Sequence, residues 1–213
     1  FEQVLAIALP HTPPEAAHAL MESLIEAQLI LHTPAERYRM LEVVREYAQT
    51  LLTPTQRRTT QERLCAWTLH EATARAPQAH TAELPHWLAF WDSVRPVLLQ
   101  TLTLLEAQGA HHQCLRLMHD TLRYWLLRPM HADALQRLAR LVESGKLSAR
   151  ARVQAQLIRV RLLCKIEMFQ TALPLALELS TLDRRHSQRG SALYWIVQTA
   201  FTIRDMSLVD RYW

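Results

Sequence analysis

The sequence contains little glycine, and this shortage limits the kinds of structure it can form. Three glycines in 213 residues leave little room for tight hairpin turns or for glycine-rich loops that cradle phosphates. Alanine, leucine, glutamine, arginine and glutamate, which mostly favour helices, dominate instead. We therefore predict an almost entirely helical, mainly all-α fold.

The sequence also has few cysteines and no long apolar run. Cys65, Cys114 and Cys164 lie far apart and form no C-x-x-C pair, which favours reduced core residues over disulfides or metal ligands. No apolar run reaches the ~18 residues of a membrane-spanning helix, and no signal peptide is recognisable. We predict a cytoplasmic protein without membrane contact. Because the chain starts at Phe1 and stops abruptly at Trp213, we expect a fragment of a larger protein.

Residues 1–52 predict helices around a two-stranded hairpin. The run Thr12-Pro-Pro-Glu15 is typical of a capped helix start, with Thr12 as the cap. Short strands are predicted over 29–31 and 37–41, and from Glu42 onward the apolar residues follow a helical period. Helices, hairpin and helix in this order are the outline of a winged-helix module.

Residues 53–109 predict linking helices. Thr53-Pro-Thr-Gln56 matches a capping box and should begin the first of them. Another helical stretch covers 84–108, with an interruption near Arg95-Pro96 because the residue before proline avoids the helical conformation. Gly109 should end this stretch.

Residues 110–213 contain an internal repeat that follows a predicted helix over 111–128. Met130, Met168 and Met206 recur every 38 residues, each between two predicted helices. This period is slightly longer than the ~34 residues of tetratricopeptide repeats. Because such units bury their apolar faces only by stacking, we predict a tetratricopeptide-like (TPR-like) α-solenoid that is truncated at its C-terminus.

Several segments, in order along nearly the whole chain, resemble one family. The stretch RYRMLEVVREYAQTLL, residues 37–52, is similar to the end of the winged helix in bacterial signal-transduction ATPases with numerous domains (the STAND class). It most resembles the helical-repeat transcriptional regulators of the AfsR and LuxR-like kind. Asp92–Leu98 and Leu122–Arg128 resemble their later helices. The resemblance implies a nucleotide-binding module ahead of the winged helix, so ATP or ADP would bind the parent protein and no cofactor would bind this fragment.

The resemblance also marks a module junction within residues 37–52. Its signature residues are Tyr38, Arg39, Glu42, Arg45, Glu46 and Tyr47. We expect Tyr47 in the core because it falls on an apolar stripe, and we expect Arg45 and Glu46 to pair locally or at a module interface. Related apoptotic and plant-resistance ATPases carry a Met-His-Asp triplet whose histidine touches the nucleotide. Met40-Leu41-Glu42 occupies that position here, and leucine offers no hydrogen bond to a phosphate.

Direct DNA binding is disfavoured by charge. In a winged helix the recognition helix would be EAAHALMESLIEAQ, residues 15–28, which has three glutamates and no lysine or arginine. Phosphates would repel it. The net charge of +4 is also modest for a nucleic-acid-binding protein.

The segment Lys146–Lys165 contains six basic residues and no acid. A solvated helix face explains this pattern, and a basic stripe lining the solenoid groove is the alternative. Such a stripe would receive an acidic peptide, a phosphate or a neighbouring domain. The candidate partner- or effector-binding residues are Arg150, Arg152, Arg159, Arg161, Lys165 and Tyr124.

The sequence offers no recognisable catalytic or metal-binding constellation. Ser144–Leu147 is the nearest match to a P-loop, but it lacks the upstream glycine and the magnesium-binding hydroxyl. The histidines lack metal-ligand spacing. We therefore predict a non-enzymatic regulatory fragment, whose winged helix restrains an upstream ATPase module and whose repeats sense a protein or small-molecule effector. Two alternatives stay open: a winged-helix DNA-binding regulator with a helical dimerisation domain, and a stand-alone TPR-like scaffold.

Overall fold

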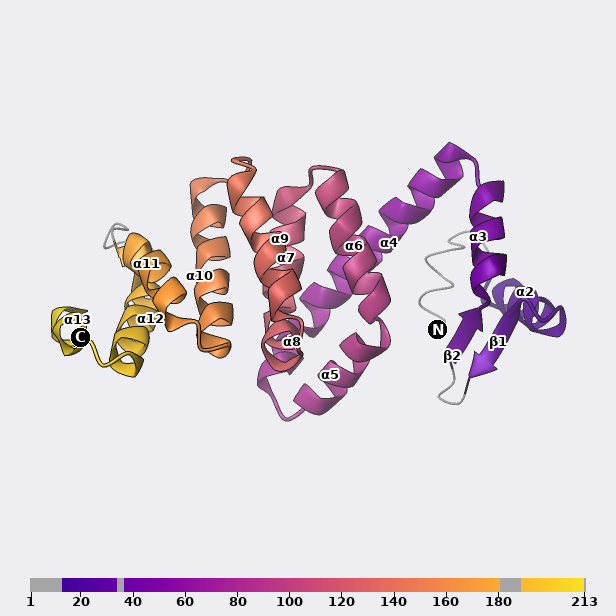
Figure 1. Cartoon of the computed structure of the whole chain (residues 1–213). Coiled ribbons are helices and arrows are strands. Elements are labelled where there is room, and N and C mark those ends of the chain that lie inside the picture. The colour runs from indigo at the N-terminus through magenta and orange to yellow at the C-terminus, as the bar shows by residue number, and fades with distance from the viewer. Residues whose placement is uncertain (1–12, 34–36, 181–188, 213) are drawn as a thin grey trace. The chain divides into compact units, whose positions relative to one another are not determined.

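The structure is a computed structural model that describes residues 13–33, 37–180 and 189–212 (Figure 1). Its secondary structure is mostly helical, which confirms the predicted mainly all-α class. The chain divides into two compact units, Phe1–His70 and Glu71–Trp213, and the division falls within one long helix.

Unit 1 contains a helix, a β-hairpin, a second helix and most of a third. These are α2 (Pro14–Glu26), β1 (Ile30–Thr33), β2 (Arg37–Met40), α3 (Glu42–Leu51) and α4 (Pro54–Arg75), which continues into unit 2. The strands are antiparallel, with Ile30 opposite Met40. Both predicted strands are confirmed, with small shifts at their ends.

The starts of α2 and α4 test the two predicted helix caps. α2 begins one residue later than predicted, because Pro14 is its first residue and Pro13 precedes it without a side-chain cap. Thr12, the predicted cap, lies outside the described residues. The capping box of α4 is confirmed: the Thr53 N–H donates to Gln56 Oε1 at 2.9 Å, and the Gln56 N–H donates to Thr53 Oγ1 at 3.2 Å.

Unit 2 is built from helices. After the end of α4 come η1 (Ala76–His80), α5 (Leu84–Ser93), α6 (Arg95–Ala107), α7 (His111–Asp120), α8 (Leu122–Leu127), α9 (His131–Glu143), α10 (Ala149–Lys165), α11 (Phe169–Ser180), α12 (Arg189–Thr202) and α13 (Met206–Tyr212). From α9 to α13 each helix packs against the next (Figure 1). The predicted break near Arg95 is confirmed, and Gly109 follows α6 with φ +71°, as a helix-ending glycine does.

The helix predicted over 111–128 is interrupted at Thr121, so this prediction was wrong in its continuity. The Tyr124 N–H bonds to the Thr121 carbonyl, three residues back, at 2.9 Å. The Thr121 hydroxyl donates to the Leu117 carbonyl at 2.7 Å and accepts from Trp125 Nε1 at 2.9 Å. A threonine hydroxyl bonded to the backbone in this way competes with the regular helix ladder. α7 and α8 therefore meet at a buried corner.

The methionine repeat is shifted in its third copy. Glu167 and Arg204 both adopt left-handed backbone conformations, with φ of 62° and 61°. The next residue in each turn, Met168 or Asp205, donates its N–H to the carbonyl five residues back at 2.9 Å. Met168 therefore corresponds to Asp205 rather than to Met206. The structural repeat between these two turns is one residue shorter than the 38-residue spacing of the methionines.

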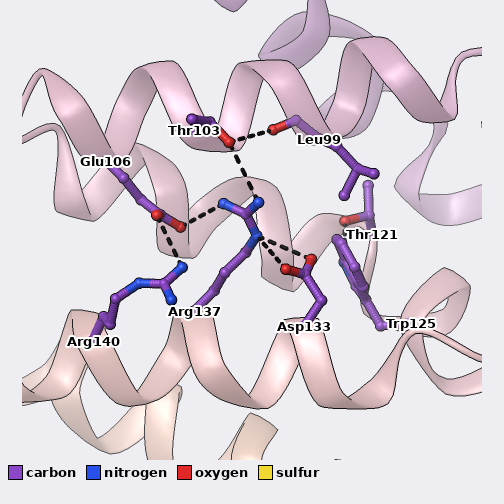
Figure 2. A network of polar contacts seen from close by, with 8 residues as sticks. All are labelled: Leu99, Thr103, Glu106, Thr121, Trp125, Asp133, Arg137 and Arg140. Carbon is purple, nitrogen blue, oxygen red and sulfur yellow. Dashed lines mark hydrogen bonds and ion pairs between the residues drawn. The ribbon is translucent and has the colours of Figure 1, made fainter.

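A buried arginine ties α9 to α6 (Figure 2). Arg137 is only 9% exposed, and its guanidinium donates to Glu106 Oε1 at 2.7 Å, Asp133 Oδ2 at 3.0 Å and Thr103 Oγ1 at 3.3 Å. Arg140 reaches the other oxygen of Glu106 at 3.2 Å. A buried charge is tolerated only when it is paired and hydrogen-bonded, and this network meets that condition.

Candidate functional site

A cavity of about 750 Å³ opens in unit 2 among η1, α7, α8, α10 and α12. Three cationic side chains line it: Arg123 from α8, and Arg161 and Lys165 from α10. Arg161 and Lys165 are one helical turn apart, so they lie on one face of α10. Apolar side chains form much of the remaining wall: Leu122, Leu126, Leu127, Phe169 and Trp195.

Among the residues that the structure describes, no acidic side chain pairs with the cations of this cavity. Within the described ranges, Arg123, Arg161 and Lys165 form no hydrogen bond or ion pair. Burial, and then the neighbouring charge of Arg123, lower the pKa of the half-buried Arg161. Two like charges therefore share the cavity, an arrangement that an anion would stabilise.

The carboxylate of Asp120 also lines the cavity. Its oxygens already have partners within the protein. They lie 3.0 Å from Thr73 Oγ1, 3.2 Å from His119 Nδ1 and 3.8 Å from Arg116 Nε. Burial alone would raise the pKa of Asp120, but the hydrogen bonds from His119 and Thr73 outweigh it and the pKa lies below its usual value. Asp120 therefore stays ionised. Its single negative charge is smaller than the combined positive charge of Arg123, Arg161 and Lys165.

The structure does not bring the predicted partner-binding residues into one site. Arg161 and Lys165 line the cavity, whereas Arg150 and Arg152 are exposed near the start of α10, outside its lining. Arg159 is half-buried and donates to a neighbouring glutamine of its own helix at 2.9 Å. The prediction that Tyr124 binds a partner was wrong, because its side chain is fully buried.

Tyr124 belongs instead to a polar network that sequence reasoning missed. Its hydroxyl donates to Asp92 Oδ1 at 3.1 Å and accepts from Arg95 Nε at 3.0 Å. Arg128 approaches both oxygens of Asp92 through its Nε, at 3.0 and 3.1 Å, and its Nη2 lies 2.5 Å from Oδ2. The two later segments that carry the family resemblance, 92–98 and 122–128, therefore meet in space.

This network predicts a pH dependence of stability. The bond from Arg128, followed by those from Tyr124 and Arg95, lowers the pKa of Asp92 to about 2 against partial burial, from about 4 in an unfolded chain. A depressed carboxyl pKa contributes stability above pH ~4 that is lost as the pH falls toward ~2. Asp92→Asn should lower the free energy of unfolding by about 1 kcal/mol at pH 7, discounted for solvent exposure, and flatten its change between those pH values.

Urea unfolding at several pH values measures this contribution. In an Arg128→Gln background the same Asp92→Asn substitution should have little further effect, because the principal donor to the carboxylate is already gone. If Asp92→Asn lowers stability equally in both backgrounds, the pairing of Asp92 with Arg128 is not the cause.

The junction signature surrounds the start of α3. Glu42 and Arg45 form a local ion pair, one of the two pairings predicted for Arg45, and Glu46 is exposed. In β2, Arg39 is opposite Leu31, and Tyr38 is 36% exposed. The prediction that Tyr47 lies in the core was wrong, because its side chain is 64% exposed.

Tyr47 is part of an exposed apolar face on α3. Val43 is 76% exposed and Leu51 is 64% exposed, and the spacing of four residues places both on the same side of the helix as Tyr47. We call Val43, Tyr47 and Leu51 the α3 apolar face. The half-buried Val44 and Ala48 each follow a residue of this face by one position, so they lie about 100° further round the helix, beside the exposed face. The apolar surface of α3 is therefore only partly covered.

Within the described parts of the chain, no three histidine, cysteine or acidic side chains group as metal ligands, and no helix is long and apolar enough to cross a membrane. Comparison with family models, curated proteins and solved structures gave no significant match.

Proposed function

We propose that the chain is a non-catalytic regulatory region of a bacterial, cytoplasmic STAND-type transcriptional regulator. Residues 1–52 would be a winged helix that restrains an upstream ATPase module, and the helices of residues 110–213 would be TPR-like repeats that sense an effector. The α3 apolar face carries this proposal, because adjacent large apolar side chains exposed on one helix face are typical of a protein interaction site.

The hairpin supports a role for α3 as a joint. β2 ends at Met40 and α3 begins at Glu42, so a single residue connects the strand to the helix. With so short a connection, a partner that binds α3 also fixes the hairpin. Exposed charged groups of Glu42, Arg45 and Glu46 flank the apolar face and suit the polar rim of an interface.

The proposed occupant of the α3 apolar face is the nucleotide-binding module of the same parent chain. The similarity of residues 37–52 to the winged-helix end of STAND ATPases is the reason for this choice. Regulation would be a shift between closed and open populations. An effector on the repeats can move that equilibrium only if it binds the two arrangements with different affinities.

Polar substitutions on the α3 apolar face test this function. Tyr47→Ser and Val43→Ser remove exposed side chains, so unit 1 should remain folded while its partner loses apolar contact. We expect each to weaken binding of the separately expressed nucleotide-binding module about tenfold, in isothermal titration calorimetry. Tyr194→Ser is a matched control, because Tyr194 is 59% exposed in unit 2 and should not affect this affinity. Equal affinities for Tyr47→Ser and the parent sequence would contradict the proposal.

A further inference from the structure

The cavity of unit 2 has the size of a small-molecule site. Its volume of about 750 Å³ lies within the ~300–1,000 Å³ typical of ligand pockets. Elements distant in sequence form it, from η1 at Ala76–His80 to α12 at Arg189–Thr202. A ligand bound there would contact several helices at once and could therefore bias their packing.

The cationic side of the cavity fits one anionic head group. Arg123 and Arg161 are near enough for their charges to interact, and Lys165 lies one turn from Arg161 on the same helix face. Within the part of the chain that the structure describes, none of the three has an acidic partner. Guanidinium groups bind carboxylates and phosphates through paired hydrogen bonds. An anion between these side chains would supply the missing counter-charge.

The apolar side of the cavity requires a second feature in the ligand. Leu126, Leu127, Phe169 and Trp195 line it, and inorganic phosphate or acetate would leave these side chains uncovered. Gln198 and Thr202 follow Trp195 along one face of α12 and also line the cavity, so polar groups accompany the apolar wall. The complementary molecule has a charged end and an apolar body.

We propose that this cavity binds a small amphipathic organic anion, with one carboxylate or phosphate head on an acyl or aryl body. The inference rests on the sensing role proposed for the repeats and names the class of ligand they sense. An extended acidic peptide fits less well, because Arg150 and Arg152 lie outside the cavity.

Calorimetric titration of the 213-residue chain with four probes tests the ligand class. Octanoate and octyl phosphate carry both features, octanol lacks the charge and acetate lacks the tail. We expect octanoate or octyl phosphate to bind at least about tenfold more tightly than octanol and acetate. The ratio between the two anions identifies the preferred head. Equal binding of octanol and octanoate, or no binding of either anion, would overturn the proposal.

Variants locate the binding. Arg161→Gln should weaken octanoate binding about tenfold or more, and Leu127→Asn, at an exposed position of the apolar wall, should weaken it several-fold. Arg150→Gln removes an exposed charge from the same helix outside the cavity and should leave the affinity unchanged. Thermal unfolding of each variant shows whether it folds.

Two results would show that this cavity is not the site of octanoate binding. Equal octanoate affinities for Arg161→Gln and Arg150→Gln would place the binding elsewhere. Binding of a hexaglutamate peptide that depends on Arg161, without binding of octanoate, would make the cavity a peptide site.

If the anion probes fail to bind while Tyr47→Ser still weakens module binding, the ligand class is wrong and the proposed function stands. If the anions bind and Tyr47→Ser has no effect, the restraint by α3 is wrong instead.

Discussion

Replacing Arg137 with methionine is expected to lower the free energy of unfolding by about 3 kcal/mol. Methionine preserves much of the side-chain length, so the loss comes mainly from charge and hydrogen bonds. Asp133 would lose its donor at 3.0 Å and Glu106 its closer donor at 2.7 Å (Figure 2). A carboxylate left in a partly buried position without its partner is costly, because its attraction to arginine no longer offsets its desolvation.

Arg140→Met is the matched control for Arg137→Met. Arg140 bonds to the same glutamate at 3.2 Å, but its side chain is 47% exposed, so water can replace much of what is lost. We expect this control to cost about 0.5 kcal/mol or less. Urea unfolding followed by circular dichroism measures both variants. Similar losses for the two would show that the burial of Arg137 does not set its contribution.

Truncating Trp125 to alanine is expected to cost about 4 kcal/mol. The indole is fully buried, and its Nε1 donates to Thr121 Oγ1 at 2.9 Å at the corner between α7 and α8. Alanine would leave a large void and remove the donor that accompanies the helix break. Trp125→Phe retains most of the volume and should cost about 1–2 kcal/mol, mainly for the lost hydrogen bond.

Tyr194→Ala provides the comparison for Trp125→Ala. Tyr194 is also aromatic and helical, but it is 59% exposed and makes an edge contact with Trp195 at 5.2 Å between ring centroids. Its truncation should cost well under about 1.5 kcal/mol. The same urea titrations report this difference. If both truncations cost the same, the corner at Trp125 is not part of the stabilising core.

The sequence predicted the features that depend on neighbouring residues. The capping box at Thr53–Gln56 needs only two side chains three residues apart, and the structure contains it. Cys114 was expected to be a core residue, and its side chain is buried. Such signals are local, so they do not depend on how distant parts of the chain pack.

Features that depend on distant residues could not be predicted in the same way. Asp92 and Arg128 are 36 positions apart, and nothing in the local pattern of either indicates their pairing. Arg161 and Lys165 are only four residues apart in the sequence, but Arg123 joins them only because α8 lies beside α10. Tyr47 fits an apolar period, yet periodicity cannot show whether the molecule covers that side of a helix.

The sequence of the gene upstream of the codon for Phe1 tests the central claim most directly. The proposal that this region regulates a STAND ATPase predicts a P-loop module, with its glycine-rich loop and Lys-Ser or Lys-Thr pair, ending within about 300 residues before Phe1. A start codon immediately before Phe1 would contradict the claim. The α3 apolar face would then need a partner on another chain.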